Sequence, residues 1–227
     1  MSQEELDAAF SLSYDPDSPM QLYARYQGKF EPTLCNYCID LIQMDDVIND
    51  ILINIRIYSG SVRYLKYGDS YILQNMYYYI DTTPQLDVSR EVLQIMDINN
   101  DGFDDFVLDL GLVGNKNKYS LAFVYDTENA IYTLLGHFYT ATYIPNGQTI
   151  YEQNNAPMGY PSQHCKYLVV GTEAILMESI DWLGDSHTYQ KRIDGELVTL
   201  LEDATYKELC EMIVDFETWR TIPASIE

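Results

Sequence analysis

The clearest pattern along the chain is an alternation of apolar and polar positions, which predicts β-strands. Isoleucine occupies every second position from Ile51 to Ile57, so one face of this segment is uniformly apolar. Similar segments predict further strands over residues 62–67, 71–80, 106–110, 118–125, 130–139, 165–170, 174–180, 188–193 and 196–201. Turn sequences separate them at residues 59–60, 68–69, 126–129 and 194–195. The pattern therefore predicts a mainly antiparallel sheet.

A helix is predicted near the C-terminus, over residues 205–220. Thr205 and Glu208 have the spacing of a capping box, in which each side chain bonds the other residue's backbone N–H. The apolar residues that follow recur at helical spacing on one face, namely Leu209, Met212, Ile213, Phe216 and Trp219. This face is expected to pack on the sheet.

Three stretches have a less definite pattern. Residues 34–50 place several apolar side chains near one helical face, but Asp45 interrupts it, and residues 88–96 also leave helix and strand open. Residues 144–163 contain repeated proline, glycine and asparagine, which predicts a long loop. The first 33 residues are acidic and punctuated by proline and glycine, so they are expected to be irregular with one short helix or strand near 20–26.

The most specific chemistry lies in residues 97–105, which place oxygen-bearing side chains at alternate positions around a glycine. Asp97, Asn99 and Asp101 occupy positions 1, 3 and 5 of a calcium loop, and Gly102 lies where the backbone turns sharply. The carbonyl of Phe103 falls at position 7 and Asp105 at position 9. Because Ca²⁺ takes six to eight oxygens, these five residues are the predicted ligands.

The loop differs from an EF-hand at both ends. The position of the bidentate glutamate is Leu108, and residues 106–110 follow with the period of a strand rather than a helix. An ordinary turn is the alternative interpretation, since Asp, Asn and Gly are also turn residues. That alternative explains Gly102 and one neighbour, but not four oxygen donors together, so we expect a calcium loop at the entrance to a strand.

Composition narrows the possible partners and chemistry. The 227 residues include 13 basic and 35 acidic side chains, a net charge of −22, which disfavours nucleic acid and anionic membranes and is compatible with a cationic protein. No segment reaches the length of a membrane span. The 21 tyrosines suit half-buried strands, although a sugar-binding surface would use the same residues. The oligomeric state is left open.

Cysteines and histidines do not form a convincing catalytic pattern. Cys35 and Cys38 have redox or zinc spacing, but no second such pair exists. Buried free thiols are expected, with a disulfide between Cys165 and Cys210 as the next interpretation. Cys165 with His137 or His187 could act as a nucleophile, and a hydrolase could use some carboxylate pair among the many acidic residues. No nucleophile elbow, phosphate loop or paired-histidine motif occurs, so no enzymatic activity is predicted.

The first residues do not resemble a secretion signal, because they are acidic and lack an apolar run. The chain is therefore either cytosolic or a mature or truncated form of an exported protein. A weak calcium site favours an extracellular or periplasmic location, because extracellular modules bind calcium with dissociation constants of roughly 10⁻⁴–10⁻³ M. A cytosolic location stays open.

The run from Asp97 to Phe106, followed by the strands 119–125 and 131–138, resembles bacterial secreted proteins of the VCBS/FG-GAP calcium-loop type. Within that group it is most similar to small exported β-proteins with one such loop and a closing Asp-Gly hairpin, here residues 189–201. Some of these are periplasmic inhibitors of lysozyme-like enzymes or immunity proteins against them. The resemblance implies calcium ligation by the five residues named above, and it implies no inhibitory residue.

These observations define one expected architecture and three functions. The fold class is α+β: a mainly antiparallel sheet, either an open barrel or sandwich-like, with a C-terminal helix. An irregular or partly helical segment over residues 1–50 packs on a calcium-loop domain over 51–227. The function expected is a calcium-stabilised, non-enzymatic binding module of an exported bacterial protein, with a partner such as a cationic lysozyme-like hydrolase. A hydrolase and a purely structural cell-surface domain are the alternatives.

Overall fold

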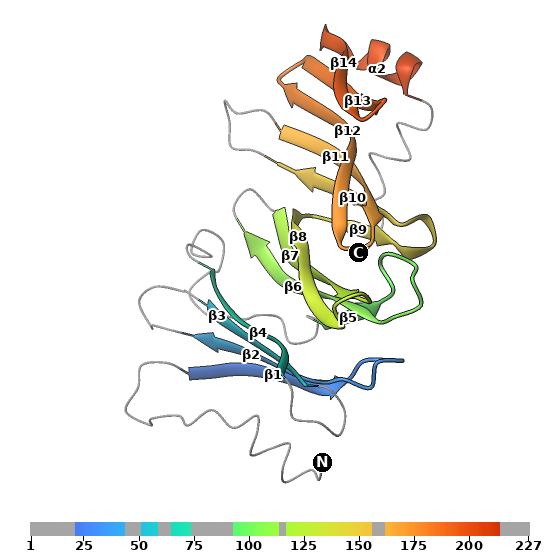
Figure 1. Cartoon of the computed structure of the whole chain (residues 1–227). Helices are drawn as coiled ribbons and strands as arrows, with labels where there is room; N and C mark the ends of the chain where they lie inside the picture. Colours follow the sequence, from blue (N-terminus) through green and yellow to red (C-terminus); the bar gives the residue numbers. More distant parts are fainter. Residues whose placement is uncertain are drawn as a thin grey trace.

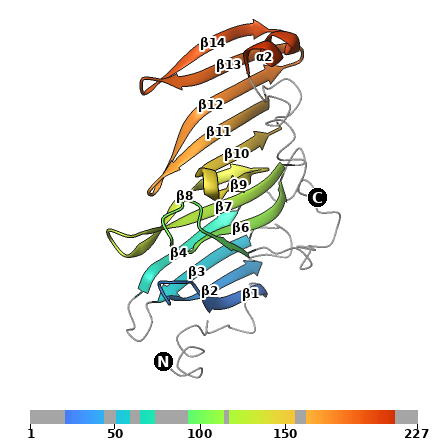
Figure 2. The same ribbon diagram turned by 90° about the vertical axis from the view of Figure 1, so that its right-hand side faces the viewer.

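The chain forms three antiparallel sheets that follow one another in space (Figures 1 and 2). The computed structural model describes residues 21–43, 51–58, 65–73, 93–113, 117–155 and 162–213. The first sheet has the order β1 (Gln21–Lys29), β2 (Asn36–Gln43), β3 (Ile51–Tyr58), β4 (Leu65–Leu73). The middle sheet has the order β5 (Leu93–Met96), β6 (Asp105–Val113), β7 (Asn117–Asp126), β8 (Ile131–Tyr139).

The third sheet has six strands, and each strand pairs with the one next to it in the chain. It comprises β14 (Glu196–Ala204), β13 (Ser186–Ile193), β12 (Glu173–Leu183), β11 (Ser162–Val170), β10 (Thr149–Asn154) and β9 (Thr142–Ile144). A 3₁₀ turn, η2 (Pro145–Gly147), joins β9 to β10, and α2 (Tyr206–Met212) follows β14. As described, none of the three sheets closes into a barrel, and their packing is compatible with the sandwich-like alternative.

The middle sheet is apolar on both faces, because it lies between the other two. On one face, Phe106 pairs with Phe123 across β6 and β7, and their rings stack at 4.6 Å. This face packs on the first sheet in a cluster of buried residues. Its members are Phe30, Cys35, Tyr37, Ile39, Ile55, Ile57, Phe106, Leu108, Leu121, Phe123 and Tyr132. The central stretches of β6 and β7, residues 106–108 and 121–124, are continuously apolar for this reason, as in strands that are covered on both sides.

The opposite face of the middle sheet packs on the third sheet. Val107 pairs with Ala122, one position along from the phenylalanine pair, so both point away from the first sheet. The buried residues of this second cluster are Ile98, Val107, Ala122, Val124, Phe138, Ile150 and Val169. Ile98 belongs to the predicted calcium loop, so the loop itself contributes to the packing between sheets.

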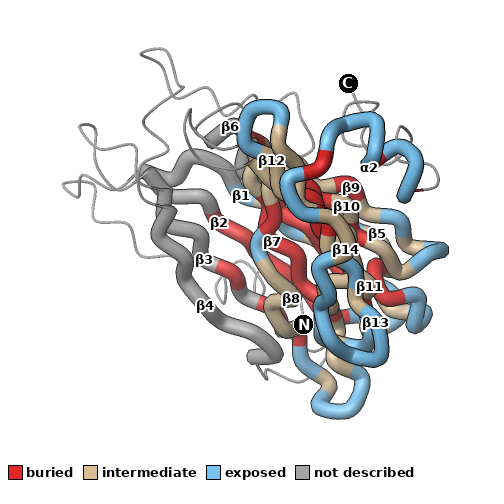
Figure 3. Tube along the Cα trace, turned by 90° about the horizontal axis from the view of Figure 1, so that it is seen from above, coloured by how far each residue is buried: buried red, intermediate tan, exposed pale blue. Residues whose placement is uncertain are grey.

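The far end of the third sheet has a smaller core of its own. Leu209 and Ile213, from α2 and the residue after it, pack on Ile180 and Tyr189. Figure 3 shows that buried residues run through the middle sheet, whereas much of β14 and α2 is exposed. Among the described residues, no helix is long and apolar enough to cross a membrane.

Several predictions from local pattern are confirmed. The isoleucine segment is β3, with Ile55 and Ile57 fully buried. The strands expected over 106–110, 118–125 and 130–139 are β6, β7 and β8, and those expected between 165 and 201 are β11 to β14. The Asp194-Gly195 hairpin turn has positive φ at both residues, as its sequence predicts. Two of the stretches for which the pattern left helix and strand open contain strands, at residues 36–43 and 93–96.

Two predictions of turn or loop are wrong. The turn expected at Gly68-Asp69 lies inside β4, where both residues pair with β3. The long loop expected over 144–163 instead contains the end of β9, the turn η2 and the whole of β10. At Gly68-Asp69, pairing with β3 overrides the local preference of glycine and aspartate for turns. In the second segment Pro145–Gly147 do form a turn, but the residues after them pair with β9 and β11. The turn expected at 59–60 lies outside the described residues.

The helix is shorter than its apolar pattern predicts. The capping box is confirmed, since the Thr205 N–H donates to Glu208 at 2.8 Å and the Glu208 N–H donates to Thr205 Oγ1. However, Ile213 is extended, with φ −102° and ψ 108°, so α2 ends at Met212. Met212 is also 47% exposed rather than buried against the sheet. Phe216 and Trp219 lie outside the described residues.

Residues on both sides of the expected boundary at residue 50 share one sheet. Within the segment expected to be irregular or partly helical, residues 21–29 and 36–43 form β1 and β2. β2 pairs with β3 over its whole length, from Asn36 opposite Tyr58 to Gln43 opposite Ile51. The first sheet is thus continuous across that position.

Candidate functional site

The predicted calcium loop connects β5 to β6 at one end of the middle sheet. Its backbone has positive φ at Asn100 (57°) and Gly102 (89°), two positions where only small or amide side chains are well tolerated. A β-carbon at Gly102 would contact nothing within 4 Å, so glycine is needed there for its backbone conformation and not for space. The Asp-Asn-Gly composition of the loop therefore has a direct conformational cause.

Short polar side chains fold the loop on itself. The Asp97 carboxylate accepts hydrogen bonds from the backbone N–H of Asp101 at 3.0 Å and of Gly102 at 2.8 Å. The Asn99 Oδ1 atom accepts from the same Asp101 N–H at 3.2 Å, and Asp101 accepts from the Phe103 N–H at 3.0 Å. Oxygens of Asp97 and Asn99 consequently converge on one backbone position.

Asp105 closes the loop from inside the protein. Its side chain is fully buried, and its two oxygens accept from the N–H of Ile98 at 2.8 Å and of Tyr125 at 2.7 Å. Burial raises the pKa of Asp105 to about 7, and the two N–H donors oppose that shift. The carboxylate of Asp101 adds to the increase, which indicates that these two acidic groups influence one another across the loop.

The donor set has the chemistry that Ca²⁺ prefers, although the side chains are arranged around backbone N–H groups. Asp97, Asn99, Asp101, the Phe103 carbonyl and Asp105 offer only oxygen ligands. Within the described residues, no three His, Cys, Asp or Glu side chains are grouped as a metal site. Asp97, Asp101 and Asp105 belong to that residue set, so their three carboxylates are not gathered at one point. The chemical fit rests on the type and spacing of the loop's oxygens, with Asn99 and the Phe103 carbonyl included.

The residue before Asp105 ties the loop to the first sheet. Asp104 and Glu31 exchange two bonds: the Glu31 N–H donates to the Asp104 carboxylate at 2.6 Å, and the Asp104 N–H donates to the Glu31 carbonyl at 2.7 Å. The Tyr132 hydroxyl donates to the Asp104 carbonyl at 3.0 Å. Because Glu31 lies in the β1–β2 connection, these bonds join the first and middle sheets.

Asn99 ties the same loop to the third sheet. Its side-chain amide donates to the Gly171 carbonyl in the β11–β12 turn at 3.1 Å, and the side chain itself is only 3% exposed. The Gln148 side chain, directly after η2, donates a hydrogen bond to the Asn99 carbonyl. Residues 97–105 thus contact all three sheets, and we call this arrangement the three-sheet junction.

Sequence reasoning missed the residues that make the junction. Glu31, Asp104, Gln148 and Gly171 lie up to 140 positions apart in the chain (from residue 31 to residue 171), and no local pattern connects them. One signal was present: Asp104 is an additional acidic residue beside Asp105 at the start of an apolar strand. A charged residue at that place needs a partner, and here the partner is the Glu31 backbone.

The alternative catalytic candidates lie in other environments. Cys35, Cys38 and Cys165 are buried free thiols and Cys210 is an exposed one, so the disulfide between Cys165 and Cys210 is not formed. Burial raises the pKa of the Cys165 thiol to about 12, which opposes formation of a nucleophilic thiolate. His187 Nδ1 lies 3.1 Å from the Ala204 carbonyl, and the His137 ring stacks on Tyr119.

Comparison with known proteins adds a structural likeness only. No protein-family model matches the chain, and no curated protein matches it. Among solved structures, it is similar to a Xanthomonas type IV secretion system related protein at 11% sequence identity. The match covers 78% of this chain and 98% of that chain, with a TM-score of 0.43. A likeness at that level does not assign a function.

Proposed function

We propose that the chain is a calcium-stabilised, non-enzymatic binding module of an exported bacterial protein, in which one Ca²⁺ braces the three-sheet junction. The observation that supports this most directly is that the loop with the five proposed oxygen ligands also hydrogen-bonds to all three sheets. A cation held there would stabilise the loop and, through it, the packing between the sheets. A rigid arrangement of sheets is what a binding surface requires.

The proposed ligands are the oxygens of Asp97, Asn99, Asp101 and Asp105 together with the Phe103 carbonyl. When bound, Ca²⁺ offsets the mutual repulsion of the three carboxylates, which lie within nine residues of one another. Asp97 and Asp101 accept bonds from backbone N–H groups, and a carboxylate oxygen keeps a second lone pair for a metal. Asp105 anchors the end of the loop to β7 through the Tyr125 N–H.

A thermal melt with calcium against EGTA tests the metal. For a site with a dissociation constant on the order of 1 mM, 10 mM calcium adds about 1.4 kcal/mol to the free energy of unfolding. In a chain of this length that corresponds to an increase in Tm of roughly 3–5 °C. We expect this increase in the native chain and its loss in Asp101→Ala, because Asp101 is exposed and its removal leaves the core intact.

A matched control lies in the same sheet. Asp126 is a partly exposed aspartate that also accepts backbone N–H bonds within a turn, here from Glu128 and Asn129, but it belongs to no oxygen cluster of the predicted type. Asp126→Ala should keep the full calcium response. If calcium leaves the Tm of the native chain unchanged, or raises it equally in Asp101→Ala, the loop is an ordinary turn and the calcium proposal fails.

The partner proposed is a cationic protein, and a lysozyme-like hydrolase is the example that the charge suits. Thirty-five acidic against 13 basic residues give a field that speeds association with a basic partner and weakens as salt is added. Biolayer interferometry with a purified cationic muramidase, in low and in 0.5 M salt, measures this. Absence of binding at low salt excludes the proposal that the chain binds and inhibits a lysozyme-like hydrolase. The calcium proposal is decided by the thermal melt alone.

A purely structural cell-surface domain is the second candidate, and the three-sheet junction favours it equally. In that case calcium stabilises the fold and no cationic partner binds. The proposed calcium site supports an extracellular or periplasmic location, because calcium is abundant there. The hydrolase alternative names no particular pair of carboxylates, so it stays a less supported candidate.

A further inference from the structure

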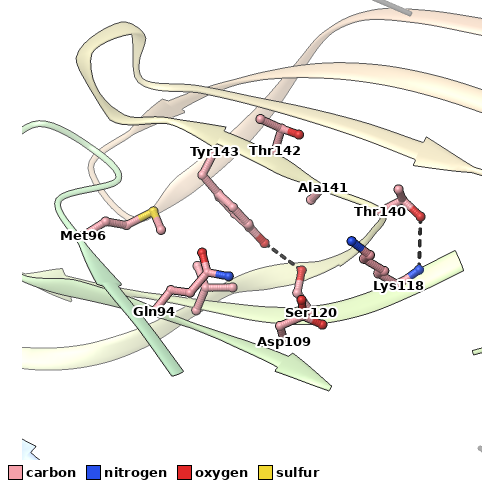
Figure 4. A pocket seen from close by; sticks show the side chains of 10 residues that line it. Gln94, Met96, Asp109, Lys118, Ser120, Thr140, Ala141, Thr142 and Tyr143 are labelled. Atoms are coloured by element: carbon pink, nitrogen blue, oxygen red, sulfur yellow. Dashed lines mark hydrogen bonds between the residues drawn. The ribbon is translucent and has the colours of Figure 1, made fainter. Parts of the chain in front are cut away.

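A small polar pocket lies on the middle sheet, under the strand β9, and it is separate from the oxygens of the calcium loop. Its volume is about 130 Å³. The lining side chains come from β5 to β7 and from the segment that enters β9; they are Gln94, Met96, Val107, Asp109, Lys118, Ser120, Thr140, Ala141, Thr142 and Tyr143 (Figure 4). We call this site the polar pocket.

The pocket exists because the middle sheet changes character along one face. The face toward the third sheet is apolar at Val107 and Ala122, but two positions further along it presents Asp109 opposite Ser120. Asp109 and Ser120 place polar atoms on this face beside the apolar side chains of Met96 and Val107. The cavity lies between these residues and the segment of the third sheet that covers them.

An irregularity in strand pairing lies directly beside these residues. Asp109 is opposite Ser120, yet the next paired positions are Leu112 and Lys118, so β6 has one more residue than β7 in this interval. Such bulges redirect side chains and are frequent next to binding and active sites. Here the bulge places Lys118 and Asp109 in the lining of one cavity.

Strand β9 forms the opposite wall. The Tyr143 hydroxyl lies 2.8 Å from Ser120 Oγ, and Figure 4 shows the Tyr143 side chain reaching from β9 toward the strand that carries Ser120. Burial raises the pKa of Tyr143, so its hydroxyl stays protonated and can donate. The backbone N–H of Lys118 donates to Thr140 Oγ1 at 3.1 Å, which fixes the approach to β9.

We propose that the polar pocket binds a small zwitterion, with its carboxylate at Lys118 and its ammonium group at Asp109. A cavity of this volume holds about four water molecules, so it suits a molecule of the size of glycine. An ammonium and a carboxylate side chain in one lining attract opposite charges, and the hydroxyls of Ser120 and Tyr143 supply further hydrogen bonds. This site goes beyond the proposed calcium-dependent binding function.

The test is an NMR titration of the full chain with glycine, with acetate and methylammonium as probes that each bear one of the two charges. The shifts of the Met96 methyl group and of the Ala141 and Thr142 amides report on the cavity, because these residues line it. For so small a ligand we expect a glycine dissociation constant on the order of 1 mM. Acetate and methylammonium should each bind at least about tenfold more weakly.

Two variants and one control locate the charges. Lys118→Met and Asp109→Asn should each weaken glycine binding at least about tenfold, because each removes one charge while retaining the shape of the side chain. Lys207→Met, at an 86% exposed side chain on α2, should leave it unchanged. Tyr143→Phe keeps the ring and removes the hydroxyl, so it tests the wall without changing charge.

The results separate the outcomes. The zwitterion proposal is overturned if glycine causes no shift at 50-fold the expected dissociation constant (about 50 mM). It is also overturned if glycine binds the two charge variants as well as the native chain, or if acetate binds as tightly as glycine. Running each titration with calcium and with EGTA keeps this result independent of the metal, since loss of the calcium response leaves the pocket residues in place.

Discussion

Two acidic turns of the middle sheet have similar local chemistry and different surroundings. The Asp126–Asn129 turn joins β7 to β8, and the bonds that Asp126 accepts within the described part of the chain come from residues two and three positions later. The Asp97–Asp105 loop uses the same kind of aspartate-to-backbone bond, but its residues also contact Glu31 and Gly171. Local aspartate chemistry therefore makes a turn, and long-range contacts make it a junction.

The carboxylates of the two turns reflect this difference. Asp126 is partly exposed, and hydrogen bonds from Asn129 hold its pKa below the ordinary value of 3.8. Asp105 is fully buried, and burial raises its pKa to about 7. The same residue type is thus favoured as an anion at the surface and penalised inside, since desolvation opposes the charged form.

The largest expected effect is from removing the buried member of this pair. Asp105→Ala leaves the N–H groups of Ile98 and Tyr125 without their acceptor inside the protein, which should lower the free energy of unfolding by about 3 kcal/mol. Urea denaturation in EGTA measures this without any metal contribution. Asp126→Ala is the control, since its donors face water. Equal losses in the two variants would show that the junction adds nothing to an ordinary turn.

A smaller effect is expected from the amide that links the middle and third sheets. Asn99→Ala removes the bond to the Gly171 carbonyl and should cost about 1–2 kcal/mol, because the side chain is buried. Asn129→Ala, in the surface turn, should change stability by no more than about 0.5 kcal/mol. Hydrogen exchange can localise the change: the Val169 amide, which donates to the Gln148 carbonyl, should exchange faster only in Asn99→Ala.

Backbone conformation offers a pair of opposite substitutions. Gly102→Ala forces an alanine to φ 89° and should destabilise the protein by about 1 kcal/mol, although its β-carbon has space. Ala130 already has φ 56° at the end of the surface turn, so Ala130→Gly should raise stability by about 0.5 kcal/mol. Thermal melts of both variants check the signs. The same sign for both would contradict the assignment of backbone strain.

The smallest expected effect is on the pH dependence of stability, and it compares Asp126 with the buried carboxylate of Glu152. Burial raises the pKa of Glu152 above its ordinary value of 4.5, although the Tyr139 N–H and the Tyr167 hydroxyl donate to it. Its unfolded form ionises first, so its contribution to stability falls as pH rises from about 4.5 through the folded pKa. Asp126 acts in the opposite direction. Its contribution to stability is fully present above pH 3.8 and is lost as the pH falls through its lowered folded-state pKa.

Carbon-13 NMR of the side-chain carboxyls measures both midpoints. Glu152 should titrate above 4.5 and Asp126 below 3.8. Glu152→Gln should reduce the fall in stability above pH 4.5, while Asp126→Asn should leave that part of the curve unchanged. A Glu152 midpoint at or below 4.5 contradicts the assigned effect of burial.

Local sequence determined the elements whose conformation depends on neighbours in the chain. The alternation of isoleucine predicted β3, Asp194-Gly195 predicted a turn with positive φ, and Thr205 with Glu208 predicted the start of α2. Each follows from backbone sterics or from hydrogen bonds within four residues. The composition of the 97–105 loop and its positive φ at Gly102 were predictable for the same reason.

Tertiary structure decided everything that depends on a distant partner. Gly68-Asp69 lies in a strand because β3 pairs with it, and residues 149–154 form β10 because β11 is beside them. α2 ends at Met212, where the backbone becomes extended, although the apolar pattern continues. Asp105 is buried, and Asn99 reaches Gly171, only because three sheets meet at this loop. Strand pairing and burial join residues far apart in the chain, so a pattern read along the sequence contains the turn but not the junction.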